Sequence, residues 1–290
     1  MNEFAIDKQQ MRRAFSRAAA GYDAAAVLQR EVCMRMLDRL HEIRLQPTRI
    51  LDAGCGTGWG GRQLATRYPN AQLIALDIAI GMLQTTRGSS GWWQKLFGGS
   101  RQLPVCGDFE ALPLATASMD MVWSNLALQW CNDLPATFVE LRRVLKTDGL
   151  LMFSTFGPDT LKELRQAFAG IDGHTHVNRF ADMHDLGDML MQAGFAEPVM
   201  DMEYVTLTYA DLRGVLHDLK AIGAHNATAG RGQGLMGKNA WARVVENYER
   251  LRRDGKLPAT YEVVYGHAWK PQPRVTADGA AIVRTSFDLK

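Results

Sequence analysis

Strand-like and helix-like segments alternate between residues 49 and 156, and this alternation constrains the fold more than any other feature of the sequence. Short apolar runs are separated by segments whose apolar residues recur at helical spacing. Strands that alternate with helices favour right-handed βαβ units in a parallel sheet, with helices on both faces. The expected strands cover residues 49–53, 72–77, 102–108, 119–125 and 150–156, and the expected helices cover 58–68, 80–86 and 135–146.

The rest of the chain is predicted to surround this α/β core. Helical spacing predicts an N-terminal arm, residues 1–40, of one or two amphipathic helices broken near Gly21. After residue 156, the expected helices (159–168, 183–193, 209–222 and 240–253) outnumber the expected strands (199–208 and 260–269). The connection between the last two strands has about 50 residues, against about 2–6 for an ordinary loop. We therefore expect a core at 41–208 and 258–270, a helical lid insertion at 209–257 and a C-terminal tail at 271–290.

Composition excludes several classes of protein. Of the 290 residues, 47% are hydrophobic and 22% charged, which is typical of globular proteins and excludes a disordered or fibrous chain. Lys and Arg exceed Asp and Glu by only two, 33 against 31, so a dedicated nucleic-acid binder is not expected. Neither a membrane span nor a signal peptide is evident, and we expect a cytoplasmic protein. The unpaired spacing of the cysteines predicts reduced thiols and no metal site: Cys33, Cys55, Cys106 and Cys131.

The strongest local signal is ILDAGCGTGWGG at residues 50–61, where a strand leads through three glycines into a helix. Such glycines allow close approach of the backbone to a ligand, and a helix start offers free N–H groups. The loop formally matches the dinucleotide fingerprint at Gly56, Gly58 and Gly61, with Asp77 19 residues beyond Gly58. A nicotinamide dehydrogenase is therefore one alternative.

Acidic residues after three successive strands favour S-adenosylmethionine instead. Asp52 precedes the first glycine, where a carboxylate suits an ammonium and a sulfonium but repels a pyrophosphate. Asp77 ends the second strand and is placed to accept hydrogen bonds from ribose hydroxyls. Asp108 offers an acceptor for an adenine amino group, and Phe109 offers a ring for the purine face. Asn125 ends the fourth strand at the same edge of the sheet, where such folds bind their ligands.

Residues 52–58 spell Asp-x-Gly-x-Gly-x-Gly, and here the sequence resembles the class I S-adenosylmethionine-dependent methyltransferases. The resemblance implies a Rossmann-like sheet, mostly parallel with an antiparallel last strand, and S-adenosylmethionine as the cofactor. It implies the following cofactor-binding residues: Asp52, Gly54, Gly56, Gly58, Asp77, Ile78, Asp108, Phe109 and Asn125.

Beyond the glycine loop, the sequence resembles the malonyl-acyl-carrier-protein O-methyltransferases of biotin synthesis across residues 7–270. The similar segments include FSRAAAGYDAAAVLQREV at 15–32, SNLALQW at 124–130, FGPDTLKELR at 156–165 and PATYEVVYGHAWK at 258–270. The resemblance implies methyl-esterification of the free carboxylate of a malonyl thioester, with an acyl carrier protein as partner. An insert containing Trp92 and Trp93 does not match the family, and Gly223 to Asn226 stands where some members have a threonine before the histidine.

The expected reaction places few demands on catalytic residues. A carboxylate is ionised at neutral pH and needs no general base, so proximity and desolvation suffice and no essential catalytic residue is expected. Tyr22 and Trp130 could equally be packing residues, Arg179 a helix cap, Lys220 a solvated charge and His225 an ordinary loop histidine. The residues predicted to orient the substrate are Tyr22, Gln129, Trp130, Asn178, Arg179, Lys220, His225 and Asn226.

A basic stretch at residues 231–256 holds seven Lys or Arg against three Asp or Glu. It is either a docking patch for the acidic carrier protein or a solvated helix face. Two other functions also remain open. One is methylation of another small acid or phenol, because the core motifs do not encode the acceptor. The other is an assembly factor or hydroxylase with a methyltransferase fold, since SNLALQW and FGPDTLKELR also resemble respiratory-complex assembly proteins.

Overall fold

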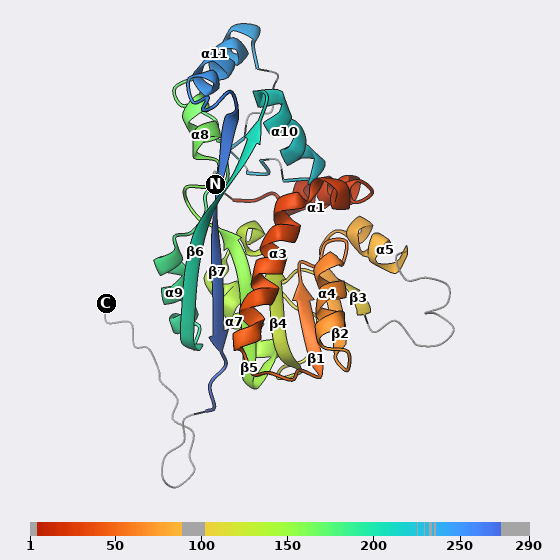
Figure 1. The fold of residues 1–290 in the computed structure, drawn as a ribbon. Coiled ribbons are helices and arrows are strands. Elements are labelled where there is room, and N and C mark those ends of the chain that lie inside the picture. Colours follow the sequence, from red (N-terminus) through yellow and green to blue (C-terminus); the bar gives the residue numbers. More distant parts are fainter. Residues whose placement is uncertain are drawn as a thin grey trace.

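A seven-stranded sheet forms the centre of the molecule (Figure 1). The structure is a computed structural model that describes residues 5–88, 102–224, 226–228, 230–231, 234 and 236–273. The strand order is β3-β2-β1-β4-β5-β7-β6, and β7 runs antiparallel to both of its neighbours while the other pairs are parallel. This arrangement confirms the predicted Rossmann-like fold. The strands are β1 (Arg49–Ala53), β2 (Gln72–Asp77), β3 (Gln102–Cys106), β4 (Met119–Asn125), β5 (Leu145–Phe156), β6 (Ala196–Tyr209) and β7 (Leu257–Trp269).

Helices cover both faces of the sheet because successive strand residues point to opposite sides. In β4, Trp123 packs under α3 (Val27–Arg39) and α4 (Trp59–Arg67), while its neighbour Val122 packs under α7 (Leu134–Val144) and α9 (Met183–Gln192). The buried cluster around Trp123 and the buried cluster around Val122 thus lie on opposite faces of the sheet. Strand order reverses between β1 and β4, and the carboxyl ends of these strands form the crevice in which such folds bind ligands.

The predicted N-terminal arm has three helical segments instead of one or two. They are α1 (Lys8–Ala18), α2 (Tyr22–Ala25) and α3, with breaks at residues 19–21 and at Ala26. The break expected near Gly21 is therefore present. Val32 and Met36 of α3 are fully buried against the sheet. A single run of helical spacing thus contains one helix over the cofactor edge and another in the main core.

The strand predicted at 150–156 begins earlier, at Leu145, and the preceding helix ends at Val144. Leu145 pairs with Met119, and a register shift follows before Leu150 pairs with Met121. Positive φ at Asp148 accommodates this irregularity. Helical spacing alone did not reveal the boundary.

The connection between β6 and β7 contains α10 (Leu212–Ala221) and α11 (Lys238–Glu249). In Figure 1, α10 lies beside α1, whereas α11 lies next to α8 at the far end of the molecule. The remaining helical elements are α5 (Ile80–Gly88), α8 (Lys162–Phe168) and the short 3-10 turns η1 (Leu40–Glu42) and η2 (Leu128–Trp130). Within the described part of the chain, no helix has the length and apolar character needed to cross a bilayer. Trp92, Trp93 and most of the expected tail lie outside the described residues.

Candidate active site

The glycine loop makes a tight turn between β1 and α4. Gly54, Gly56 and Gly58 have φ of 79°, 53° and 77°, values that residues with a Cβ rarely adopt. A Cβ at Gly54 would lie 2.4 Å from the Cβ of Ala127. The backbone N–H groups of Gly54 and Cys55 both donate to the Leu76 carbonyl, at 2.8 and 2.9 Å. The loop is therefore fixed against β2, and only glycine fits its closest approach.

Asp77 holds the loop from the end of β2. Its two carboxylate oxygens accept hydrogen bonds from the backbone N–H groups of Gly56, at 2.9 Å, and Ala79, at 2.7 Å. Burial raises the pKa of Asp77 to about 6, although these two donors lower it in part. Ile78 follows Asp77 in the chain, and both residues line a pocket beside the loop. Asp77 thus lies beside the loop, and its role as a ribose acceptor stays a prediction.

Three buried polar atoms have no hydrogen-bond partner among the residues that the structure describes, and their residues line one small cavity. They are Oδ2 of Asp52, Oε1 of Gln29 and Nε1 of Trp123. Burial raises the pKa of Asp52 to about 7, and the charge of Asp77 adds to the rise. Unpaired polar atoms inside a protein are costly and point to a missing partner.

The methionine end of S-adenosylmethionine fits these three atoms. Its ammonium can donate to Asp52 and Gln29, and its carboxylate can accept from the indole N–H of Trp123. The sequence had singled out only Asp52. Gln29 is one residue of a helix and Trp123 one apolar residue of a strand, so no sequence motif marked either as a ligand residue.

Another pocket, of a shape to take the adenosine end, adjoins this small cavity. Four residues line both: Tyr22, Gly54, Gly56 and Asn125. Asp77, Ile78 and Phe109 line it, together with Met11 and Phe15 of α1. The first helix of the arm therefore forms one wall of the cofactor pocket. Asn125 is held by two bonds, from its Nδ2 to the Gln29 carbonyl and from Ser154 Oγ to its Oδ1, each 2.9 Å.

Asp108 has a partner that the sequence had not indicated. Lys8 Nζ lies 2.5 Å from Asp108 Oδ2 and 2.5 Å from Glu110 Oε2. The other Asp108 oxygen accepts from the Glu110 backbone N–H at 3.0 Å. This ion pair fastens the start of α1 over the Phe109 side of the pocket. The adenine role of Asp108 stays a prediction.

Gly58 serves the loop in a different way from its neighbours. It is the N-cap of α4, and a Cβ there would lie 2.8 Å from Thr86 Cγ2. Gly61, the third glycine of the dinucleotide fingerprint, lies within α4 against Gln102. Neither residue lines the two cofactor pockets.

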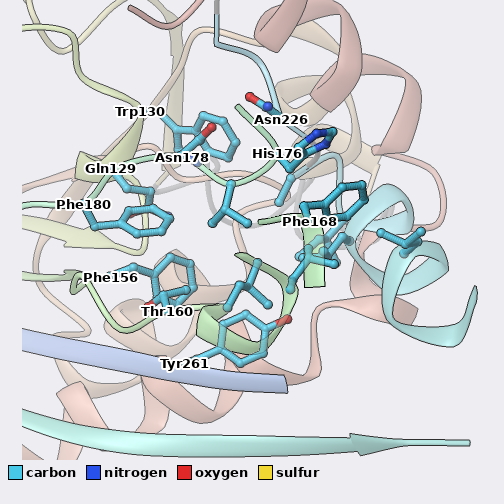
Figure 2. Close-up of a pocket in the computed structure, with 17 residues that line it drawn as sticks. Gln129, Trp130, Phe156, Thr160, Phe168, His176, Asn178, Phe180, Asn226 and Tyr261 are labelled. Atoms are coloured by element: carbon cyan, nitrogen blue, oxygen red, sulfur yellow. The ribbon is translucent and has the colours of Figure 1, made fainter. Parts of the chain in front are cut away.

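A second cavity of about 230 Å³ adjoins the cofactor pocket at Trp130, which lines both. Figure 2 shows aromatic rings around it, among them Phe156, Phe168 and Phe180. The Phe156 ring contacts the Phe180 ring with centroids 5.7 Å apart. Most of the wall is thus apolar, and it is built from η2, α8, α10 and the segment before α9.

One polar group in this second cavity is unsatisfied. Asn178 is only 9% exposed, and its Oδ1 has no hydrogen-bond partner. In Figure 2 it lies beside Trp130, between Gln129 and His176. His176 instead stacks on Phe168 at 3.8 Å and contacts Asp172 at 2.8 Å. Asn178 is therefore the group in this cavity that most clearly needs a ligand.

The structure brings together some of the predicted substrate residues and separates others. Gln129, Trp130 and Asn226 line the second cavity with Asn178. Asn226 already uses its amide, because Nδ2 donates to the Thr175 carbonyl and Oδ1 accepts from the Thr228 backbone N–H. Tyr22 lies at the cofactor pocket instead.

Arg179 and Lys220 are both exposed and do not line the second cavity. Spacing along the chain could not show that Lys220 faces away from the cavity that Leu216 and Leu219 of the same helix line. The cap of α9 is Asp182 itself, whose side chain accepts from the His184 N–H. His225 lies outside the described residues.

Comparisons with known proteins agree with this geometry. A family model described as "Methyltransferase domain" matches residues 51–153. The malonyl-[acyl-carrier protein] O-methyltransferase of Gallionella capsiferriformans is 80% identical over the full length of both chains. Two solved structures share the fold at low identity. The YcgJ protein of Bacillus subtilis has a TM-score of 0.58 and 14% identity, covering 82% of this chain and 99% of its own. Phosphoethanolamine N-methyltransferase 2 of Haemonchus contortus, in complex with S-adenosyl-L-methionine, has a TM-score of 0.54 and 16% identity, covering 89% and 57%.

These findings decide between the cofactors that the glycine loop left open. The cofactor is S-adenosylmethionine, since the chain matches the methyltransferase model and a methyltransferase relative, and the dinucleotide alternative is set aside. The methyltransferase match begins within β1 and ends within β5, so it spans the glycine loop and both carboxyl ends of the crevice. The full-length identity extends over the arm and the connection between β6 and β7 as well. The chain belongs to the malonyl-[acyl-carrier protein] O-methyltransferase family, within the class I S-adenosylmethionine-dependent methyltransferases.

Proposed function

We propose that this protein methylates the free carboxylate of malonyl-acyl carrier protein, as an early step of biotin synthesis. The observation that carries the proposal is the junction at Trp130 between a cofactor pocket that contains Asp77 and Asn125 and an apolar cavity with one unsatisfied amide. A cation with polar ends fits the first, and a short acyl thioester fits the second. Membership of the family supports the same acceptor.

The cofactor supplies an electrophilic methyl group carried on a sulfonium. The protein's residues have to bind it, align the acceptor and exclude water. The malonyl carboxylate is ionised at neutral pH, so no side chain is needed to remove a proton. This agrees with the expectation that no residue acts as an essential acid or base.

The apolar wall of the second cavity contributes by desolvation. A carboxylate that has lost its water shell is a stronger nucleophile, and its attraction to a nearby cation is greater at low dielectric. Asn178 and Gln129 lie on the Trp130 side of this cavity, so they can orient the malonyl group. Gln129 is itself fixed by a 2.6 Å bond from its Nε2 to the Leu126 carbonyl.

We further propose that residues 209–257 act as the lid of the acceptor cavity. Leu216, Leu219 and Ile222, from α10 and its C-cap, contribute its outer wall. The segment after α10 also contacts the arm, because the Asp7 N–H donates to the Ala227 carbonyl at 2.9 Å.

All four cysteines are free thiols, which suits the expected cytoplasmic location.

Methyl-labelled S-adenosylmethionine tests the proposal. Incubation with malonyl-acyl carrier protein should place the label on the carrier protein, and mild base should release it because a methyl ester is formed. Label that is absent or stable to base would reject the proposed reaction.

A further inference from the structure

An exposed basic face is formed by two helices that are far apart in the sequence. Arg12, Arg13 and Arg17 lie in α1, and Arg213 and Lys220 lie in α10. Arg17 and Lys220 line one surface hollow between the two helices, and we call the five residues the α1–α10 face. All five are exposed, and none makes an ion pair within the described part of the chain. Figure 1 shows the two helices next to each other. The face therefore carries five uncompensated positive charges.

Nearby acids do not neutralise these charges. Asp218 lies 3.6 Å from His217, its neighbour in α10, and Asp211 caps α10 through the Gly214 N–H at 2.8 Å. Asp7 caps α1 through the Gln10 N–H at 2.9 Å. The sequence of α1, KQQMRRAFSRA, contains no acid at all.

The basic stretch predicted as a docking patch has a different character. Arg250 pairs with Glu246 at 2.6 Å and Arg252 with Glu249 at 2.7 Å, each within α11 or the turn after it. Two of the seven basic residues of the stretch are thus compensated locally, and a third, Arg231, lies 3.9 Å from Asp7. In Figure 1, α11 also lies at the opposite side of α10 from α1 and the cofactor pocket. The pairing of Arg250 and Arg252 favours a solvated helix face over a docking patch, the two interpretations that the sequence left open.

The α1–α10 face is connected to both binding sites. The other side of α1 lines the cofactor pocket through Met11 and Phe15, and the Phe15 ring packs edge-on against Trp130 with centroids 5.2 Å apart. The other side of α10 lines the acceptor cavity through Leu216 and Leu219. The same two helices therefore bear the exposed cations and enclose the site.

A surface hollow of about 490 Å³ separates the two helices. Arg17, His217 and Lys220 line it, together with small residues such as Ala14 and Ala18. Lys220, which does not reach the acceptor cavity, thus has a place beside Arg17 on this outer surface. The face offers a partner both charge and a concave shape.

We propose that the α1–α10 face docks the acidic acyl carrier protein, an inference that rests on the proposed function. A carrier protein presents a negatively charged surface around its thioester arm, and opposite charges on two surfaces accelerate and orient association. Docking here places the carrier protein on the two helices that enclose the site. The thioester arm of the carrier protein then has to pass only the thickness of these helices to reach the acceptor cavity.

Charge reversal tests the assignment. The triple variant Arg12→Glu, Arg13→Glu, Arg17→Glu should raise the KM for malonyl-acyl carrier protein at least about tenfold at low salt. The difference from wild type should shrink at about 0.5 M salt, because surface charges are then screened. A second variant, Arg213→Glu with Lys220→Glu, should act in the same direction. Binding of S-adenosylhomocysteine, measured by calorimetry, checks that each variant is folded.

The matched control reverses the same number of charges on the other patch, as Arg250→Glu, Arg252→Glu, Arg253→Glu. Its KM should stay within about twofold of wild type. The docking assignment is overturned if the α1 variant binds S-adenosylhomocysteine normally and keeps the wild-type KM, or if the α11 control is impaired equally. Failure of the wild-type protein to methylate malonyl-acyl carrier protein would instead reject the proposed function, and the docking assignment with it.

Discussion

The cofactor pocket and the acceptor cavity bind opposite charges by different physical means. The cofactor pocket contains two buried carboxyls, Asp52 and Asp77, set at the ends of neighbouring parallel strands. The acceptor cavity is walled largely by aromatic and aliphatic residues, and its unsatisfied polar group is a neutral amide, Asn178. Fixed charges therefore bind the cation, whereas exclusion of water activates the anion. The cost to stability is also concentrated on the cofactor side.

The largest expected effect is a loss of cofactor binding when Asp52 is replaced. Asp52→Asn removes the charge that faces the ammonium and leaves the side-chain volume almost unchanged. We expect the Kd for S-adenosylmethionine to rise roughly 10- to 100-fold, which corresponds to a charge-assisted hydrogen bond of about 1.5–3 kcal/mol. Calorimetric titration measures this directly.

Asp120→Asn is the matched control for that substitution. Asp120 lies at the opposite end of β4 from Asn125. Burial raises the pKa of its carboxyl, but hydrogen bonds from Lys146 and Thr48 outweigh burial and lower this pKa to about 2. Its replacement should leave the cofactor Kd unchanged. An equal loss in both variants would mean that Asp52 acts only through general stability.

The glycine loop gives the next effect. Gly54→Ala places a Cβ 2.4 Å from that of Ala127 at a φ of 79°. We expect the free energy of unfolding to fall by about 1–3 kcal/mol, together with weaker cofactor binding. Denaturant unfolding measures the loss. Gly173→Ala, where a Cβ meets nothing within 4 Å, should have little effect, and equal destabilisation by the two would contradict the close approach.

A third substitution sharpens the contrast from the acceptor side. Asn178→Leu keeps the number and branching of the side-chain heavy atoms but removes the unsatisfied amide. The KM for the malonyl substrate should rise about 3- to 10-fold, the loss of one hydrogen bond, while the Kd for S-adenosylhomocysteine stays the same. Asn247→Leu, which removes an amide bonded to the Ala167 carbonyl outside the cavity, should leave the KM unchanged. A parallel rise in the Kd of S-adenosylhomocysteine would show that the two sites are not separate.

The last comparison concerns the dependence of stability on pH. Asp52 and Asp77 have pKa values of about 7 and about 6 in the folded protein, against about 3.9 in an unfolded chain. Because the folded state then binds more protons, these groups favour folding fully below about pH 4, and the contribution is lost as pH rises through about 7. The melting temperature of the ligand-free protein should therefore fall between about pH 5 and pH 8. Asp52→Asn should reduce this slope, and an unchanged slope would contradict the buried charge.

More residues of the cofactor pocket than of the acceptor cavity could be predicted from the sequence, and the reason is physical. Gly54, Asp52 and Asp77 could be predicted because a strand end, a positive φ and a buried carboxylate each demand a particular residue type at a particular spacing. The alternation of strands and helices then predicted that these strand ends lie at one edge of a parallel sheet. The glycine loop and the two carboxylates of the cofactor side are thus encoded locally, whereas Gln29 and Trp123 are not.

The acceptor side could not be read in the same way, because residues from distant segments create it. Gln129 and Asn178 meet only after α7, β5 and α8 have folded between them. Lys220 and Leu219 are adjacent in sequence, yet one faces solvent and the other the cavity. The cofactor side has the same kind of long-range contact, because Lys8 pairs with Asp108 across 100 residues. Apolar walls also accept many residue types, so they leave no motif.

The central claim is that methyl transfer reaches a free carboxylate held in the acceptor cavity. Intact-mass spectrometry of two carrier-protein thioesters, malonyl and acetyl, tests it most directly, because only the malonyl form has that carboxylate. After incubation with the protein and S-adenosylmethionine, the malonyl form should gain the mass of one methyl ester and the acetyl form should be unchanged. An unmodified malonyl form, or methylation of both forms, would contradict the account.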